Sequence, residues 1–291
     1  MLAKQLKSLQ VVAEDGNTYS LYSGQNPADL LALDGAGMAT VRRITQRTPL
    51  QNGVTDRGFR LEPRKMTLAL YIYQGSDEQI ADTMRDKLAY IFGPTITPLQ
   101  LRATRLDSTV RQIDCFVDGT LDFPQSERMG ASQKLIVPLM APDPTWYDPT
   151  QVSATTSLAS LPVTTSVYSA AGVTADDWPV IEITGPITNP VVNHFPVGDS
   201  IDFTGTTIPS GETWVIDLRP GYKKVYRKSD NANRMYALTT SSIRYFGTLR
   251  MLNQKLAASY SQTGNSFQVT GSASTGASSF KLLYYKRYLS L

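Results

Sequence analysis

The chain of 291 residues carries 28 Lys and Arg residues against 25 Asp and Glu residues, which gives a formal net charge of only +3 at pH 7. A balance this close to neutral does not point to a polyanionic partner, and 41% hydrophobic with 18% charged residues excludes a wholly disordered chain. The length predicts about two domains, each able to bury its own core.

One cysteine, Cys115, is present, which excludes an intramolecular disulfide and a cluster of thiolate ligands. Cys115 alternates with Ile113 and Val117, so we expect an inert core residue. Lys4 and Lys7 interrupt the apolar start, and no apolar run approaches a membrane span. We therefore expect a soluble protein that can mature in a reducing cytoplasm.

The first predicted elements form a hairpin. Val11 and Val12 lead through Asp15-Gly16 into the run TYSLY from Thr18, and Asp-Gly between two strand-like runs is a strong turn signal. Further on, GAGMAT at 35–40 half matches a dinucleotide-binding fingerprint. It lacks the third glycine and is followed by the strand-like VRRIT, so we do not expect a nucleotide site.

Basic residues crowd the next stretch. They are Arg42, Arg43, Arg47, Arg57, Arg60, Arg64 and Lys65. One interpretation is a long loop between strands with a solvated basic face. The other is a surface between subunits, because guanidinium groups pair well with carboxylates across interfaces. Phosphate binding is the least favoured of the three.

The segment 64–106 predicts a strand, a helix and a returning strand. Met66, Leu68, Leu70 and Ile72 alternate with polar or smaller residues, which is typical of a sheet with one buried face. A helix over about 77–92 should cover that face. Ser76 and Gln79 form a capping box, the apolar stripe is Ile80, Met84, Leu88 and Ile91, and Gly93-Pro94 ends the helix.

Two more strands, 110–118 and 133–141, follow the returning strand at 99–106. Pro138 lies inside the second and predicts an edge strand or a bulge. The run APDPTWYDP at 141–149 then stops regular structure with three prolines. We place the domain boundary there, which gives an α+β domain over 1–149 and a second domain over 150–291.

The second domain is predicted to be all β. The Ser- and Thr-rich segment 151–177 fits either a linker or short strands. Strand patterns and turn signals then recur at spacings typical of a sandwich, with turns at Asn189-Pro190, 209–211 and 220–221 and a last pair of strands at 267–270 and 280–288. Trp214 alternates with Ile216 and Leu218, so it belongs in the core.

An enzyme has little support in the sequence. The one histidine, His194, lies beside a turn signal and is better explained as a hydrogen-bonded structural or surface residue. Asp176-Asp177 is the least unlikely pair for hydrolysis by two carboxylates. Adjacent acidic residues in a Thr-rich turn such as this one usually lie in solvent. No metal, nucleotide or nucleophile motif is present, so we expect no catalytic site, cofactor or metal.

Aromatic residues suggest two binding alternatives in the second domain. Trp178, Tyr222, Tyr226 and Tyr236 could stack on a sugar ring. The run GYKKVYRKSDN at 221–231 mixes tyrosines with Lys and Arg, as single-strand nucleic-acid surfaces do. The near-neutral total charge favours a solvated hairpin instead, so we consider nucleic acid an unlikely partner.

Several of these pieces together resemble the distal tail proteins of siphophages. The resemblance is carried by 41–72 (VRRITQRTPLQNGVTDRGFRLEPRKMTLALYI), the helix ending in IFGP, DCFVDGTLDFP, LIVPLMAPDPTWYDP, GPITNPVVN and the final YYKRYLSL. It covers both halves of the chain in order.

The resemblance implies a tail-tube-like β-sandwich with one helix, followed by a galectin-like or carbohydrate-module-like sandwich. It implies a structural role in the virion, as a hexameric ring that is assembled in the host cytoplasm and placed at the distal end of the tail. The expected partners are further copies of the chain, the tail tube protein, the tape-measure protein and the baseplate hub or tail-associated protein. A carbohydrate-binding, host-recognition module of the tail, with a host surface glycan as ligand, is the alternative.

A ring of identical subunits needs two different contact patches on each copy. Our candidates for the basic patch are Arg42, Arg43, Arg57 and Arg60. Our candidates for the acidic patch are Asp114, Asp118 and Asp122.

Overall fold

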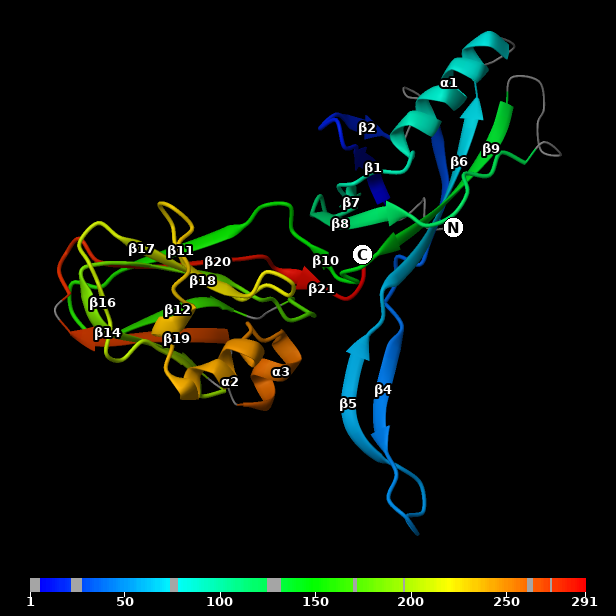
Figure 1. Ribbon diagram of the computed structural model, residues 1–291. Coiled ribbons are helices and arrows are strands. Elements are labelled where there is room, and N and C mark those ends of the chain that lie inside the picture. The colour runs from blue at the N-terminus through cyan, green and yellow to red at the C-terminus, as the bar shows by residue number, and fades with distance from the viewer. Residues whose placement is uncertain are drawn as a thin grey trace. The chain divides into compact units, whose positions relative to one another are not determined.

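The computed structural model describes residues 6–21, 28–73, 78–124, 132–169, 172–195, 197–260, 264–272 and 274–291. Contacts divide the chain into two compact units, one of Met1–Pro149 with Tyr288–Leu291 and one of Thr150–Arg287 (Figure 1). The last four residues thus belong to the first unit, whereas the predicted second domain included them. Each unit is described separately below.

The first unit is built on one antiparallel sheet with the order β2-β1-β7-β8-β9-β6-β3. β10 pairs with β8, and β21 pairs with β10. The strands are β1 (Leu6–Val12), β2 (Thr18–Ser20), β3 (Asp29–Asp34), β6 (Arg64–Tyr73), β7 (Leu99–Arg105), β8 (Val110–Val117), β9 (Ser132–Ala141), β10 (Trp146–Tyr147) and β21 (Arg287–Tyr288). The predicted hairpin around Asp15-Gly16 is β1 with β2.

A single apolar core lies within this unit, with side chains from both halves of the sheet. The predicted alternation of β6 is confirmed, since Met66, Leu68, Leu70 and Ile72 are all buried. The predicted covering helix is α1 (Glu78–Ile91), whose Leu88 is buried in the same core. The predicted cap Ser76 lies outside the described residues, and so does the side chain of Ile80.

Pro138 corrects one expectation, because its strand is central and not at an edge. β9 pairs with β6 along its whole length, but with β8 only at Phe116–Met140 and Val117–Leu139. The Pro138 carbonyl accepts a bond from the Asp118 amide (3.0 Å), so this residue faces the point where the β8 ladder ends. β9 pairs again beyond this point, with Asp122 opposite Ile136, so that residues 118–121 stand opposite Val137 and Pro138. A proline is tolerated at such an irregularity, which is the bulge that the prediction also allowed.

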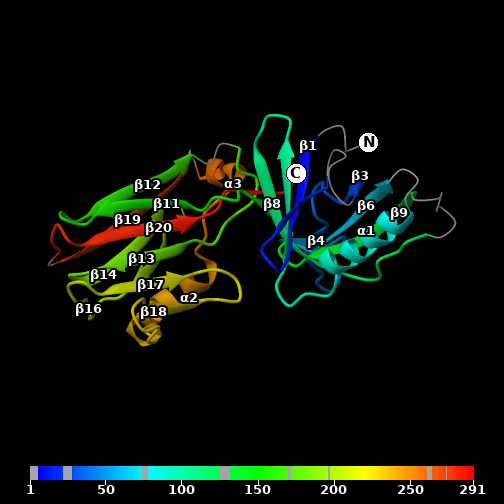
Figure 2. The same cartoon turned by 90° about the horizontal axis from the view of Figure 1, so that it is seen from above.

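The second unit is a sandwich of two antiparallel sheets, with the orders β11-β20-β13-β17-β18 and β12-β19-β14-β15, and with β16 beside β14 (Figure 2). The strands are β11 (Val152–Ser157), β12 (Val163–Ser169), β13 (Val180–Thr184), β14 (Ile187–Phe195), β15 (Asp199–Asp202), β16 (Thr207–Ile208), β17 (Thr213–Asp217), β18 (Lys224–Arg227), β19 (Gly264–Ser272) and β20 (Ser279–Tyr284). Trp214, Ile216 and Leu218 lie in its core, as predicted.

The Ser- and Thr-rich segment, for which a linker and short strands were both open, forms the strands β11 and β12. One turn prediction for this unit is wrong. Asn189-Pro190 lies inside β14, where Asn189 has φ 52° and the register with β19 shifts, so this signal marks a bulge and not a turn. The two strands predicted near the end of the chain are present as β19 and β20, and they lie in different sheets: β19 pairs with β12 and β14, and β20 pairs with β11 and β13.

The unit is also not purely β. It contains the helices α2 (Thr240–Thr248) and α3 (Gln254–Ser259) and the short 3-10 helix η3 (Met235–Ala237). α2 packs against β15 and α3 against β19. A signal for α3 was available, because the Asn253 side chain accepts a bond from the Leu256 amide in an N-terminal cap.

The acidic pair Asp176-Asp177 is not solvated as predicted, because Asp177 is buried and Asp176 is half-buried within this unit. Asp177 is 3% exposed, pairs with the Arg287 guanidinium and accepts a bond from the Tyr285 amide (2.8 Å). Asp176 pairs with Arg250 (2.7 Å). The two carboxylates therefore tie separate segments of the second unit together, and their partners explain them without catalysis.

We predict that Asp177→Ala lowers the free energy of unfolding of the second unit by about 1 to 3 kcal/mol, because it removes a buried carboxylate that pairs with Arg287 and accepts a bond from the Tyr285 amide. Urea denaturation followed by circular dichroism measures this. Lys255→Ala, which removes an exposed charge on α3, should change the stability by no more than about 0.5 kcal/mol. Equal effects of the two substitutions would contradict the prediction.

Candidate interaction surface

The basic stretch of the first unit forms a hairpin and not the long loop of our first interpretation. β4 (Val41–Gln46) and β5 (Thr55–Leu61) pair antiparallel, with Val41 opposite Leu61 and Gln46 opposite Thr55. Within the described residues they form a sheet of two strands only. Figure 1 shows this hairpin reaching away from the sheet that carries α1.

None of the 21 residues from 41 to 61 is buried. Large apolar side chains are nevertheless present on both strands and in the turn. They are Ile44 (48% exposed), Leu50 (105%), Val54 (56%) and Phe59 (60%). A hairpin of two strands is at best marginally stable in water without another surface to pack against. The hairpin therefore has the character of a contact element that lacks its partner.

The predicted basic-patch residues lie on this hairpin, with partners that are also exposed. Arg43 pairs with Asp56 (3.0 Å), and its guanidinium also lies over the Phe59 ring at 5.6 Å. Arg60 pairs with Glu62 (3.1 Å) and Arg57 bonds the Gln46 side chain (2.9 Å). Exposed pairs of this kind contribute little stability, so these arginines remain available for another partner.

The 22 residues from 41 to 62 hold five arginines and two acidic residues, which leaves an excess of three positive charges. Arg42, the fourth predicted residue, lies 3.8 Å from Glu62, which already bonds Arg60. The hairpin is therefore a basic as well as an apolar surface.

The predicted acidic patch is only partly available. Asp114 is half-buried and accepts a bond from the Tyr147 hydroxyl (2.7 Å). Asp118 and Asp122 are exposed, and the Asp118 carboxylate lies 3.9 Å from Lys65. Asp118 and Asp122 thus remain candidates for contact with a basic partner, whereas Asp114 has a structural role in the first unit.

We call the place where residues 35–37 meet Arg64 the root of the hairpin, and Arg64 holds it together. From the sequence we placed Arg64 among the residues of a solvated basic face, but its side chain is only 2% exposed. Its Nε and Nη2 donate to the Pro144 carbonyl (2.8 and 2.7 Å), and Nη2 also donates to the Leu289 carbonyl (2.8 Å). Its Nη1 donates to the carbonyls of Gly35 (2.9 Å) and Gly37. All five N–H groups of the guanidinium are used, all on backbone oxygens.

Burial lowers the pKa of Arg64 to about 10, against a smaller opposing effect of Asp143. The side chain is still protonated at neutral pH. The backbone at Gly35 lies close to the backbone at Lys65. Gly35 has φ +80°, and a Cβ at this position would lie 2.2 Å from the Lys65 carbonyl oxygen. The glycine is therefore needed for the two ends of the hairpin to meet.

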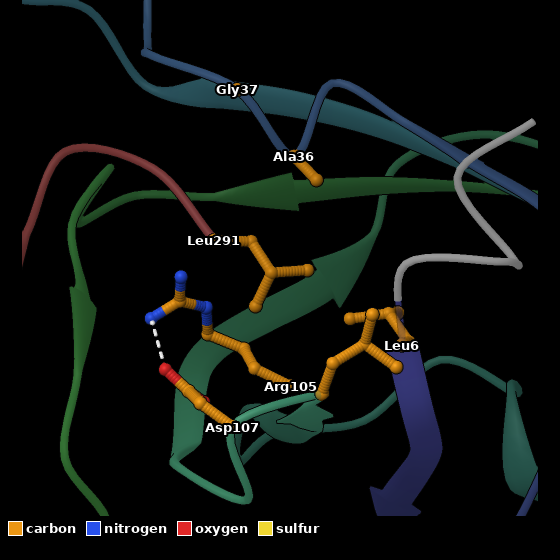
Figure 3. Close-up of a pocket in the computed structure, with 7 residues that line it drawn as sticks. Leu6, Ala36, Gly37, Arg105, Asp107 and Leu291 are labelled. Atoms are coloured by element: carbon orange, nitrogen blue, oxygen red, sulfur yellow. Dashed lines mark ion pairs between the residues drawn. The ribbon is translucent and has the colours of Figure 1, made fainter.

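A cavity of about 430 Å³ lies beside this root, shown in Figure 3. Its lining residues are Leu6, Ala36, Gly37, Arg105, Leu106, Asp107 and Leu291. Arg105 and Asp107 form an ion pair at its rim (3.2 Å), and the Leu291 side chain points into it. The cavity is mostly apolar, and its charged groups satisfy each other.

The predicted sugar-stacking residues of the second unit do not form an open platform. Trp178 is half-buried and packs on the core. The Arg219 guanidinium lies 5.0 Å from the ring of Tyr222, which is 63% exposed, and the Lys224 ammonium lies 4.4 Å from the ring of half-buried Tyr226. Each tyrosine therefore already has a cation over one face.

The basic run 221–231 is likewise matched by nearby acceptors. Arg227 pairs with Asp230 and Glu212, Lys228 bonds Glu182 (2.7 Å), and Lys223 bonds the Gly247 carbonyl (2.5 Å). This pairing agrees with the solvated-hairpin interpretation. No group of three or more His, Cys, Asp or Glu side chains in the described ranges is placed to hold a metal ion.

His194 and Cys115 have structural environments. Cys115 is 1% exposed, and burial raises the pKa of its thiol to about 12, which confirms the expected core position. His194 is fully buried and stacks on Phe267 at 4.6 Å. Among the helices of the described residues, none has the length and apolar character that a bilayer crossing requires.

No protein-family model and no curated protein matches this sequence. Among solved structures, the chain is similar to the Dit protein of phage SPP1, described as a paradigm of the hub adsorption apparatus in phages that infect Gram-positive hosts. The TM-score is 0.61 at 12% identity, over 97% of this chain and 100% of that one. Chains in two structures of the activated phage P2 baseplate, with Ca and with Sr, give TM-scores of 0.46 and 0.47 at 10% and 9% identity, over 95% of this chain and 97% of those chains.

The similarity to the SPP1 protein shows that the two chains share a mainly β fold over their whole lengths. The mainly β fold implied by the resemblance to distal tail proteins is thereby confirmed.

His194 predicts a pH dependence of stability. Its Nε2 lies 3.0 Å from the Asn265 side-chain oxygen, which also accepts from the Leu252 amide, so Nε2 carries the proton. Its buried Nδ1 has no partner among the described residues. Burial therefore lowers the pKa of His194, with Arg250 adding to the effect and Asn265 and Asp199 opposing it.

The unfolded chain takes up this proton first, at a pKa of about 6.5, so the stability of the second unit should be full above that pH and should fall as the pH drops below it. Urea denaturation between pH 5 and pH 8 measures the slope. His194 is the one histidine in the sequence, so His194→Gln should remove most of the slope in this range. Parallel pH profiles for the two proteins would exclude the explanation.

Proposed function

We propose that this protein is a structural component of a siphophage tail tip, forming a hexameric ring that joins the tail tube to the baseplate hub and the host-recognition apparatus. Its place would be the distal end of the tail in the virion, after assembly in the host cytoplasm. Its neighbours would be the tail tube protein, the tape-measure protein and the baseplate hub or tail-associated protein. The role needs no catalysis and no cofactor.

The observation that carries the proposal is the isolated hairpin of the first unit. Twenty-one residues with four large exposed apolar side chains have no buried member, in a chain that shares its fold with the SPP1 Dit protein. A second copy of the chain is the partner that fits best, because one surface is basic and apolar while Asp118 and Asp122 offer exposed acid elsewhere on the same unit.

Two different patches give a head-to-tail contact, and such contacts close into rings when the rotation between copies permits. A further contact is available at β3, an edge strand that pairs on one side with β6 within the described sheet. Its Leu31 is 44% exposed at a register shift. An edge of this kind can accept a strand from another copy.

Carbohydrate binding by a galectin-like second unit is the second candidate. It is favoured by Tyr222, whose exposed ring and neighbouring Arg219 offer one apolar face and one hydrogen-bond donor. If the unit binds sugar there, a glycan array should give signals that Tyr222→Ala reduces at least about tenfold, since stacking dominates such sites. If the glycan array gives no signal while light scattering shows an intact oligomer, carbohydrate binding is excluded and the structural role is the one that remains.

We expect Arg57→Glu and Arg60→Glu each to lower the content of hexamers in native mass spectrometry, because both side chains lie on the exposed hairpin and their reversal would repel the acidic patch of the next copy. Lys255→Glu, which reverses an exposed charge on α3 of the second unit, is the matched control and should assemble normally. Negative-stain images of the wild-type protein should show a six-fold annulus. A wild-type protein that stays monomeric at high concentration would refute the ring.

A further inference from the structure

The segment Tyr288–Leu291 follows the whole second unit in the sequence but belongs to the first unit. Three of its four residues bond to the first unit through their backbones. The Leu289 carbonyl accepts from Arg64 (2.8 Å), the Ser290 carbonyl accepts from Arg111 (2.7 Å), and the Leu291 amide donates to the Ala36 carbonyl (3.0 Å). The Arg111 guanidinium also stacks on the Tyr288 ring at 3.8 Å.

These contacts converge on the root of the hairpin. Gly35, Ala36 and Gly37 lie a few residues before β4, and Arg64 lies three residues after the end of β5. The guanidinium and the segment 288–291 thus join the chain before the hairpin to the chain after it. Figure 3 shows Leu291 beside Ala36 and Gly37. The backbone bond from Glu62 to the Thr40 carbonyl (2.9 Å) is the next one along the hairpin.

We propose that the segment 288–291 is a lock that fixes the root of the β4–β5 hairpin, so that the hairpin is held in its assembly orientation only after the polypeptide has passed through the complete second unit. The link between this lock and assembly rests on the proposed function. The lock itself rests on Arg64: without Leu289 one of its five N–H groups loses its acceptor in a buried site, and the Ala36 carbonyl loses the Leu291 amide.

This arrangement has a consequence for the order of assembly. A ribosome-bound or truncated chain that lacks residues 288–291 can form the ladders of the first unit, because the described pairings of β1, β3, β6, β7, β8 and β9 all lie within residues 6–147. Its hairpin root would be loose. Premature association of incomplete subunits is thereby disfavoured.

Hydrogen exchange measured by mass spectrometry tests the lock without reference to assembly. In a chain that ends at Arg287, and in the single variant Leu291→Pro, which removes the amide that bonds Ala36 and keeps an apolar side chain, peptides covering 35–41 and 61–66 should exchange about tenfold faster than in the wild type. Peptides covering 180–184 in the second unit should not change.

Ser290→Ala is the matched control, because it alters the segment but leaves all the backbone contacts described above in place. It should exchange as the wild type does. If the truncated chain also loses protection at 68–72, the whole first unit has unfolded and the truncation no longer tests the lock. The exchange rates of Leu291→Pro then decide whether the segment 288–291 fixes the root. Wild-type protection at both root peptides in Leu291→Pro would overturn the lock.

Native mass spectrometry of the same proteins separates the two proposals. A wild-type protein without oligomers refutes the ring but leaves the exchange result to decide the lock. A wild-type oligomer together with a loose root and no oligomer in the truncated chain supports both. A truncated chain with a loose root that still assembles as fully as the wild type overturns the coupling of the lock to assembly.

Discussion

The first unit depends on one buried cation. Removing a guanidinium from water costs several kcal/mol, and this cost is offset here by five charge-assisted bonds to backbone oxygens, with a smaller electrostatic contribution from Asp143. Because the four accepting carbonyls belong to three segments, Arg64 fixes their relative positions. Lysine could not replace it, since its three donors radiate from one point and cannot reach four carbonyls in a plane.

The position of Arg64 connects the stability of the first unit to its surface. β6 begins at Arg64 and contributes Met66, Leu68, Leu70 and Ile72 to the core, and the exposed hairpin ends only three residues before Arg64, at Leu61. A rigid sheet therefore carries a hairpin that has no core of its own. In a free subunit the order of the hairpin comes from its root, whereas in an assembly it would come also from the contact with another copy.

The sequence was most informative where a local pattern repeats. The alternation of Met66, Leu68, Leu70 and Ile72 predicted a strand and its buried face, and Trp214 was placed correctly for the same reason. Arg64 could not be placed, because it stands in a run of exposed basic residues and only the tertiary structure supplies its carbonyl partners. The prediction that Asp177 is solvated was wrong for a similar reason, because its partner Arg287 lies 110 residues away in the sequence.

The missed helices have a different cause. α2, TSSIRYFGT, is rich in residues with low helix propensity, so its helical state comes from packing against β15 and not from a local preference. Pro138 was predicted to mark an edge strand or a bulge: its strand is central, and the irregular pairing beside it is the bulge. The excess of basic residues located the candidate surface in the sequence, but it did not predict that this surface is a hairpin.

The charge on the hairpin has a second physical role. Two paired strands with exposed Ile44, Leu50, Val54 and Phe59 would be prone to associate without specificity if they were neutral, because both outer strand edges are open within the described chain. The excess of arginines makes two hairpins repel each other, while it leaves each attractive to an acidic surface on a neighbour. Self-association is thus directed from like patches toward unlike ones, which is the condition for a head-to-tail contact. The same charge that lowers the stability of the isolated hairpin therefore selects the geometry in which the hairpin can be covered.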